Sequence, residues 1–408
     1  MSSTTRGLLG LAGGLLAGSL IAVSADPAQW HLVTQLSEAL GTVWINAILM
    51  TVIPLITASL VVAIGAAPDR RTLGQLGGRA MAVFLILLVG GAIFTCLIMP
   101  VVVGWLPSRV SMAGIYSPAT EAVTPPTLAQ WLVGLMPANP VKAWADGAIL
   151  PLIVFTIIFG LAITRLTAEL REVVLQFAEA IRSIMLTILI WVSALAPVGV
   201  FALGLALAAK AGPTAVGELG AYVLMAVVLA AIGTLVLYPL VRIFGRLPMG
   251  RFGRAVAPAQ ALGFTSHSSL AALPALIEVA QRDLHYPPEI IGFCLPFSAA
   301  TFKYSAPIAS LSAAFFVSHL YGVPIAPGSL PMIGAVAVLT SFSVPGVGGG
   351  AVLASMGPVL LAAGMPTQAL GVLLALDPIP NSARTVANVT GYLAATAIVA
   401  GRPGVADG

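Results

Sequence analysis

Apolar residues fill most of the chain in long blocks, which are separated by short stretches rich in Arg, Pro and Gly. A helix needs about 20 consecutive apolar residues to cross a bilayer, so the blocks predict an all-α polytopic membrane protein. Residues 8–24 also resemble the apolar part of a signal peptide, but their length and the spans that follow favour a first membrane helix. We place the first spans at residues 7–24, 41–67, 80–105, 128–164 (broken near Pro137 and Pro140), 183–209 and 219–243.

Two later apolar stretches have centres that are too polar or too rich in glycine to face lipid. Residues 255–276 contain Thr-Ser-His-Ser-Ser, and residues 333–363 contain Val-Pro-Gly-Val-Gly-Gly-Gly. Irregular backbone at membrane depth is tolerated only where protein or a cavity surrounds it, so we predict two re-entrant helical hairpins. The span between them, residues 288–319, carries Pro296 and Pro307 on either side of a polar centre, which predicts that it unwinds midway.

The last span, residues 366–400, carries a polar stripe on an otherwise apolar helix. Its members are spaced by three, four or seven residues and share one helical face: Asp377, Asn381, Arg384, Thr385, Asn388 and Tyr392. A guanidinium at this depth must face protein or water, and its rigid fork of donors suits a carboxylate. This face therefore predicts a binding site for an organic acid, anchored by Arg384. The alternative is that Asp377 neutralises Arg384 in a purely structural ion pair.

Composition supports the membrane class, because 59% of the residues are hydrophobic and only 8% are charged, whereas about a quarter of the residues in a soluble domain are charged. With eight full spans, thirteen arginines lie on the cytoplasmic side and only Arg109 and Lys210 outside, as the positive-inside rule requires. We expect both termini in the cytoplasm, a location in the cell inner (plasma) membrane, and no nucleic-acid partner. Cys96 and Cys294 form no metal-ligand cluster, so no metal and no cofactor is expected.

Several motifs along the chain carry a more specific pattern. They are Ile53-Pro-Leu-Ile-Thr-Ala-Ser, Asn139-Pro, Ala196-Pro-Val-Gly-Val-Phe, Ser266-His-Ser-Ser-Leu-Ala-Ala-Leu-Pro and Ala383-Arg-Thr-Val-Ala-Asn-Val-Thr-Gly. In these motifs nearly the whole chain resembles the glutamate transporter family, also called dicarboxylate/amino acid:cation symporters. The resemblance implies eight transmembrane helices plus two re-entrant hairpins in an elevator-type fold, assembled as a homotrimer in the lipid bilayer.

The resemblance also implies a division of labour along the chain. Residues 1–67 and 111–218 would form the scaffold helices 1–2 and 4–5. Residues 68–110 would supply helix 3 of the mobile transport domain, and residues 219–408 would form its core.

Binding roles follow from the same resemblance, residue by residue. Arg384 would bind the distal carboxylate of the substrate, and Thr385 and Asn388 would hold the remainder. Ser268 and Ser269 would contribute from the tip of the first hairpin.

Departures from the family pattern cluster at the positions that we align with its sodium ligands, where this chain has Phe84, Leu87, Leu88, Phe302, Tyr304 and Tyr392. A hard cation needs several oxygen ligands, and Phe and Leu supply none. The usual Arg of the first hairpin tip is His267 here. The Asp that meets a substrate amino group in amino-acid-selective members is Asn381, which favours substrates without an amino group.

We therefore expect a secondary active transporter of small organic anions, C4-dicarboxylates before acidic amino acids, that works without sodium. Lys303 would supply the missing cation. A buried amine also releases its proton more readily than an exposed one, so Lys303, with His267, is a candidate proton carrier.

Three alternatives remain open at this point. The protein could be a sodium-coupled symporter, an uncoupled exchanger in which Lys303 pairs with Asp377 or the substrate, or a channel-like anion conductor. An enzyme is not expected, because no acid near His267 in sequence completes a catalytic set.

Overall fold

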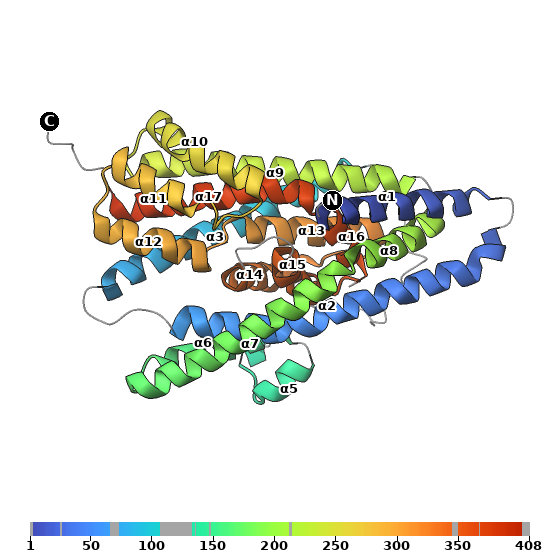
Figure 1. The fold of residues 1–408 in the computed structure, drawn as a ribbon, viewed down its shortest axis with the longest axis horizontal. Coiled ribbons are helices and arrows are strands. Elements are labelled where there is room, and N and C mark those ends of the chain that lie inside the picture. The colour runs from blue at the N-terminus through green and yellow to red at the C-terminus, as the bar shows by residue number, and fades with distance from the viewer. Residues whose placement is uncertain are drawn as a thin grey trace.

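The computed structural model describes residues 3–24, 27–65, 73–106, 133–134, 136–146, 148–211, 214–344, 350–366 and 368–401. All regular elements of this part of the chain are helical (Figure 1), which confirms the all-α prediction. The α-helices are α1 (Ser3–Ala22), α2 (His31–Gly65), α3 (Leu73–Gly104), α5 (Pro140–Ala145), α6 (Ile149–Ile163), α7 (Ala168–Ala194), α8 (Ala196–Ala211), α9 (Thr214–Phe244), α10 (Met249–Ser266), α11 (Leu273–Arg282), α12 (Pro288–Thr301), α13 (Ser305–Tyr321), α14 (Leu330–Thr340), α15 (Gly350–Ala362), α16 (Ala369–Leu376) and α17 (Pro378–Ala400). The short 3₁₀ helices are η1 (Pro27–Trp30), η3 (Pro327–Ser329) and η4 (Ser341–Ser343).

Within the described residues, three helical segments are long and apolar enough to cross a membrane. They are Leu76–Gly104 in α3, Ala168–Val192 in α7 and Gly217–Phe244 in α9. Shorter apolar helical segments are Leu9–Ala22, Ile53–Val62, Pro151–Ile163, Ala196–Ala209 and Pro327–Thr340. The count of eight full spans and two re-entrant hairpins stays a prediction.

Three predicted spans are divided in the structure. The span predicted at residues 183–209 belongs to α7 and α8, because Pro197 lacks a backbone N–H and is best placed in a first helical turn. The span predicted at residues 128–164 contains α5 and α6, and its residues 128–132 lie outside the described chain. The last helix divides at Asp377, immediately before Pro378.

Helical pairs occupy the two predicted hairpins and the interrupted span between them. α10 and α11 pack together and are joined by residues 267–272. α14 and α15 also pack together, although residues 345–349 of the glycine-rich tip lie outside the described chain. Between the hairpins, α12 ends at Thr301 and α13 begins at Ser305, so the span unwinds where the sequence predicts.

A stripe of glycines joins α1 to α8. A Cβ on Gly14 would lie only 2.3 Å from the carbonyl oxygen of Phe201, and the same close approach occurs one turn away at Gly10 and Gly18. Small residues four apart allow two helix backbones to meet, which is a common way for helices to associate in membranes. The glycine-rich first helix is therefore shaped to pack on α8.

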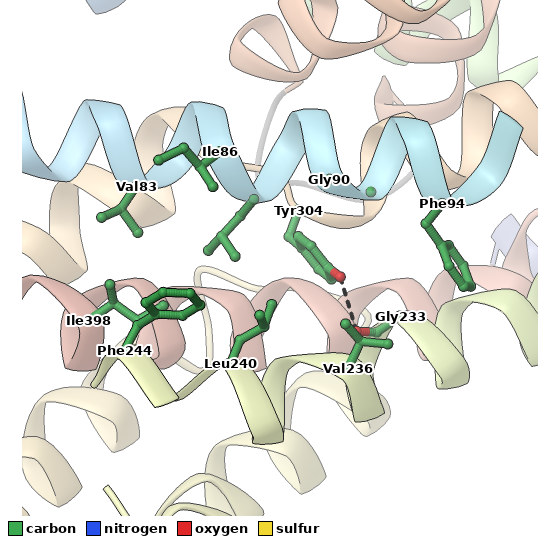
Figure 2. A pocket seen from close by; sticks show the side chains of 12 residues that line it. Val83, Ile86, Gly90, Phe94, Gly233, Val236, Leu240, Phe244, Tyr304 and Ile398 are labelled. Carbon is green, nitrogen blue, oxygen red and sulfur yellow. Dashed lines mark hydrogen bonds between the residues drawn. The ribbon is translucent and has the colours of Figure 1, made fainter. Parts of the chain in front are cut away.

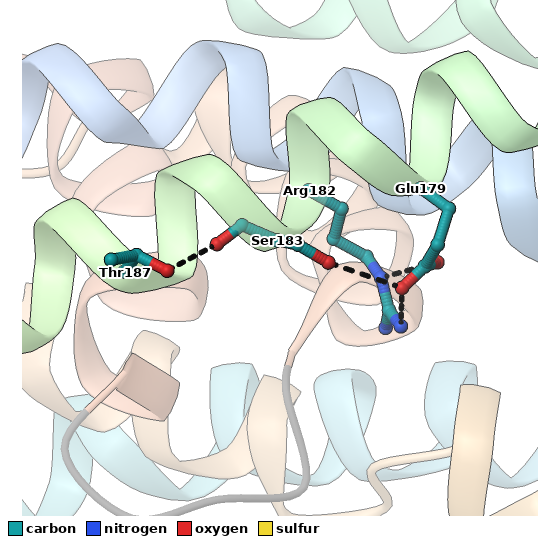
Figure 3. Close-up of polar contacts among 4 residues, drawn as sticks. All are labelled: Glu179, Arg182, Ser183 and Thr187. Carbon is teal, nitrogen blue, oxygen red and sulfur yellow. Dashed lines mark hydrogen bonds and ion pairs between the residues drawn. The ribbon is translucent and has the colours of Figure 1, made fainter.

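A row of polar side chains lies along the middle and second half of α7 (Figure 3). Arg182 donates from Nε and Nη2 to the two carboxylate oxygens of Glu179, at 2.9 and 2.6 Å. Ser183 and Thr187 extend this row of polar contacts along the helix. The side chains of the ion pair are 36% and 43% exposed, and an exposed pair of this kind contributes about 0–1 kcal/mol. This ion pair therefore contributes little to the stability of the fold.

α17 lies in the middle of the second half of the chain, between α9 and α12 (Figure 1), and it also packs on α3, α10 and α13. Its inner residues are almost completely buried from Ala387 to Ala397. α2 instead packs on α6, α7 and α8. The predicted scaffold and transport-domain boundaries, and the homotrimer, stay predictions.

Candidate functional site

The unwound segment Phe302–Tyr304 and the middle of α17 meet closely. A Cβ on Gly391 would lie 2.9 Å from Tyr304 Cβ, so only glycine allows this approach without displacement of the segment. Asn388, one turn earlier on α17, accepts a hydrogen bond from the backbone N–H of Ser305 through Oδ1 at 2.9 Å. This bond satisfies an N–H in the first turn of α13 that the helix itself leaves unpaired. α17 therefore holds the break in place.

Lys303 is the centre of a buried polar cluster, which we call the lysine cluster: Lys303, Ser269 and Tyr392. Its Nζ donates to Tyr392 Oη at 2.6 Å, to the carbonyl oxygen of Ala299 at 2.6 Å and to Ser269 Oγ at 3.4 Å. Tyr392 Oη in turn donates to Ser269 Oγ at 2.9 Å. Lys303 is only 2% exposed. An ammonium has three N–H donors, and three neutral oxygens surround it here.

The described contacts of Lys303 include no carboxylate, and Asp377 pairs with Arg384 instead. The structure therefore does not contain the Lys303–Asp377 pair that the sequence left open, whereas an uncoupled exchanger in which Lys303 pairs with the substrate stays open. The lysine cluster instead joins three parts of the chain, namely the break between α12 and α13, the last helix α17, and the tip of the first hairpin.

Aromatic rings fill the space beside the lysine cluster. Phe84 of α3 stacks on Phe302, with ring centroids 4.6 Å apart and an interplanar angle of 11°. The centroid of Phe302 lies 6.4 Å from that of Tyr392. Phe84 and Phe302 are completely buried, and Leu87 and Leu88 of α3 are buried as well. Four of the six positions that we align with sodium ligands of the resembled family therefore carry hydrocarbon side chains, and the other two, Tyr304 and Tyr392, carry hydroxyls that form hydrogen bonds with protein groups.

Arg384 forms an ion pair with Asp377 through Nη2 and Oδ1, and each residue is only 6% exposed. This is the contact that the structural alternative requires. It leaves one donor available, because Nε of Arg384 is buried and has no hydrogen-bond partner among the described residues. A buried donor without a partner costs about 1–3 kcal/mol, so an oxygen atom that accepts a hydrogen bond from this N–H would be favoured.

The tip of the first hairpin reaches α17 at a second point. His267 ends α10 in a left-handed conformation with φ of 54°, and its Nδ1 lies 3.1 Å from Ser382 Oγ. Ser268 is half-buried, whereas Ser269 is 6% exposed and belongs to the lysine cluster. The hairpin tip therefore contacts both the arginine end and the tyrosine end of the polar stripe.

The profile of the Sodium:dicarboxylate symporter family matches residues 4–402. The chain belongs to this family.

Individual relatives agree with that membership. The chain is 28% identical over 394 residues to the proton/glutamate-aspartate symporter of Escherichia coli, an alignment that covers 95% of this chain and 90% of that protein. It is 26% identical over 394 residues to the proton/sodium-glutamate symport protein of Bacillus subtilis, with the same coverage. It is 24% identical over 368 residues to the C4-dicarboxylate transport protein of Deinococcus radiodurans, which covers 89% of this chain and 82% of that protein.

As a member of the Sodium:dicarboxylate symporter family, the protein is a multi-pass membrane transporter and not an enzyme. The suspected family is therefore confirmed. The residue roles carried over from it are not tested by these findings and stay predictions.

The polar stripe of α17 supplies several different kinds of contact within this symporter. Thr385 is 4% exposed and donates through Oγ1 to the backbone carbonyl of Asn381 at 2.8 Å, while the side chain of Asn381 is half-buried. Asn388 accepts the hydrogen bond from the backbone N–H of Ser305 in α13. Two features were missed in the sequence: the contact of Ser382 with His267 and the direct bond of Tyr392 to Lys303. The local pattern around Ser382 holds no signal that could have found its partner.

Proposed function

We propose that the protein is a secondary active transporter of small organic anions, with C4-dicarboxylates preferred to acidic amino acids. Relatives named for both substrate classes, glutamate-aspartate and C4-dicarboxylate, support this range. Arg384 is the proposed anchor for the distal carboxylate, with Thr385 and Asn388 holding the remainder and Ser268 and Ser269 contributing from the first hairpin. Nε of Arg384 supports this role, because it is a buried cationic donor without a hydrogen-bond partner among the described residues.

The preference for dicarboxylates rests on Asn381. Burying a substrate ammonium is tolerable only beside a counter-charge, and an amide offers none. The same amide can donate to a hydroxyl or to a second carboxylate. Succinate, malate or fumarate should therefore compete for uptake more strongly than aspartate does, and tighter binding of aspartate would reverse the proposed order.

The second part of the proposal is that transport does not require sodium. The single observation that supports it is the lysine cluster. Lys303 is buried among neutral oxygens, where its ammonium can act as a tethered cation. Phe84 and Phe302 provide no oxygen ligand beside it. The proposal is that Lys303 does electrostatically what a bound sodium ion does in sodium-coupled transport, and that its proton, with His267 as a second carrier, couples transport to the proton gradient. The Escherichia coli relative, named for protons alone, supports this direction.

Reconstituted proteoliposomes test the proposal. Uptake of labelled succinate is measured with an inward sodium gradient alone, with an inward proton gradient alone, and with neither. We expect stimulation by the proton gradient, where each pH unit supplies about 1.4 kcal/mol per proton. Stimulation by sodium alone would overturn sodium independence and favour the sodium-coupled alternative.

Two substituted proteins separate coupling from binding. Lys303→Met should lose stimulation by the proton gradient yet retain succinate exchange, whereas Lys142→Met, at an exposed position of α5, should behave like the native protein. Proton stimulation that persists in Lys303→Met would exclude Lys303 from the coupling path. Counterflow that saturates with substrate marks a carrier, while an ohmic anion current would mark the channel-like alternative.

The remaining parts of the proposal concern assembly and placement. An elevator mechanism in a homotrimer predicts three chains per particle in native mass spectrometry. A cell inner (plasma) membrane location with both termini cytoplasmic predicts that terminal tags are reached by protease only after the cells are opened.

A further inference from the structure

A groove outside the proposed substrate site lies between α3 and α9 (Figure 2). Its volume is about 370 Å³, which falls in the usual range of about 300–1,000 Å³ for ligand pockets. The walls are aliphatic and aromatic side chains of the two helices, and the ring of Tyr304 forms part of the inner wall. The groove therefore extends from the surface of α3 and α9 to the break that holds Lys303.

Glycine residues create the hollow. A Cβ on Gly90 of α3 would meet nothing within 4 Å, so this position opens directly onto free space. Gly233 of α9 also lines the groove, but a Cβ there would lie 2.7 Å from Cδ1 of Ile308. A larger residue at position 90 would therefore fill the groove that the present sequence leaves open, whereas one at position 233 would clash with Ile308.

The lining excludes a polar ligand. The polar side-chain group of the lining is the hydroxyl of Tyr304, which already donates to the carbonyl oxygen of Gly233 at 3.0 Å. At the rim, Ile86, Val236 and Phe244 are 70%, 39% and 60% exposed. They belong to two of the three helices that are long and apolar enough to cross the membrane. In a membrane transporter such a rim faces lipid, so a hydrocarbon chain is the matching occupant.

One charged side chain lies beyond one end of the groove. Arg79 precedes Val83 by four residues on α3, so the two share a helical face, and Val83 lines the groove. Arg79 is exposed and donates through Nη2 to the carbonyl oxygen of Val399 at 3.1 Å, next to the lining residue Ile398. This arginine lies near the start of the apolar segment Leu76–Gly104, where a lipid headgroup is within reach. Basic residues at a membrane surface attract anionic lipids.

We propose that the groove binds one acyl chain of an anionic phospholipid, with the headgroup beside Arg79. The chain contacts the ring of Tyr304 on one side and the open bilayer on the other. The lipid is thereby placed next to the unwound segment.

Photolabelling tests this without reference to transport, so its outcome is independent of the proposed substrate and coupling. The full-length protein in detergent is titrated with phosphatidylglycerol that carries a diazirine in its acyl chain, irradiated, digested and analysed by mass spectrometry. We expect saturable labelling of α3 and α9 at groove-lining positions. Gly90→Leu should abolish that labelling because its side chain enters the groove without a clash.

Gly78→Leu is the matched control, since Gly78 lies on the same helix and also opens onto free space but does not line the groove; its labelling should equal that of the native protein. Arg79→Gln should keep the labelling and lose the preference for phosphatidylglycerol over phosphatidylcholine. Labelling of the groove that is absent, that never saturates, or that Gly90→Leu leaves unchanged in a folded protein would overturn the proposal. Equal labelling by the two lipids in the native protein would overturn the headgroup assignment.

Discussion

Replacing Tyr392 by Phe removes a single oxygen from the lysine cluster. In the native protein this oxygen accepts from Lys303 Nζ at 2.6 Å and donates to Ser269 Oγ at 2.9 Å. The ring of Tyr392 is completely buried, and Phe conserves its shape, so the substitution removes two hydrogen bonds and little packing. We expect Tyr392→Phe to lower the free energy of unfolding.

The size of the loss follows from the two bonds. A hydrogen bond to a charged group contributes about 1.5–3 kcal/mol, and a neutral one about 0.5–1.5 kcal/mol. Tyr392→Phe should therefore cost about 2–4.5 kcal/mol in the native background. In the Lys303→Met background the charged bond is already absent, so the same change should cost about 1 kcal/mol. The difference, about 1.5–3 kcal/mol, is the coupling energy of the two side chains.

A double-mutant cycle measures this coupling. The native protein, both single variants and the double variant are unfolded in detergent by heat and by denaturant. Tyr238→Phe is the control, because the hydroxyl of Tyr238 accepts a neutral hydrogen bond from Gln260 at 3.3 Å. Its cost should simply add to that of Lys303→Met. If Tyr392→Phe lowers the free energy of unfolding equally with and without Lys303, the tyrosine does not stabilise a buried ammonium. The lysine cluster would then hold no charged lysine.

Three further substitutions test separate parts of the structure. Gly391→Ala places a Cβ 2.9 Å from Tyr304 Cβ, and overpacking of this kind costs about 1–3 kcal/mol of stability. We expect a lower melting temperature and slower succinate uptake. Native values of both would contradict the close approach. Gly14→Leu inserts a side chain into the backbone of α8 near Phe201 and should lower the melting temperature without changing succinate affinity in the protein that remains folded. Arg384→Lys replaces a fork of donors by a point charge and should weaken succinate binding by about 1.5–3 kcal/mol in calorimetric titration; unchanged affinity would remove Arg384 from the site.

Local sequence rules were sufficient to predict the break in the span at residues 288–319 and the polar face of the last helix. The break lies between Pro296 and Pro307, where the sequence itself weakens a continuous helix. Arg384 and Asp377 are seven residues apart, so helical periodicity alone brings them to one face. That spacing could not decide between an ion pair and a substrate site. In the structure the ion pair is present, and Nε has no partner in the part of the chain that the structure describes, so one guanidinium could serve both the ion pair and a substrate.

Contacts between distant segments could not be predicted from such rules. Lys303 and Tyr392 are 89 residues apart. Each was identified as a departure from the family pattern, but that comparison did not indicate that the two side chains are in contact. His267 and Ser382 are 115 residues apart, and nothing local to Ser382 marks it. The division of the span at residues 183–209 near Pro197 was not predicted, for a different reason. A continuous apolar run indicates contact with lipid but does not show where one helix ends and the next begins.

A tyrosine at position 392 has a consequence for the charge of the proposed site that an acidic residue would not have. Arg384 and Asp377 cancel each other, so the described side chains of the break and of α17 retain a positive charge only when Lys303 is protonated. A carboxylate in place of Tyr392 would neutralise the lysine, whereas a phenol oxygen accepts its hydrogen bond and leaves the charge in place.

An anionic substrate in the proposed site is stabilised by that remaining charge, and the substrate in turn stabilises the protonated lysine. Linkage requires the two effects to be equal in free energy. Two unit charges placed about 8 Å apart at an effective dielectric constant of about 20 would interact by about 2 kcal/mol, which corresponds to roughly a thirtyfold change in affinity. Substrate and proton would then enter together because each makes the other's binding more favourable, and Lys303→Met would remove that mutual dependence while leaving Arg384 to bind the carboxylate.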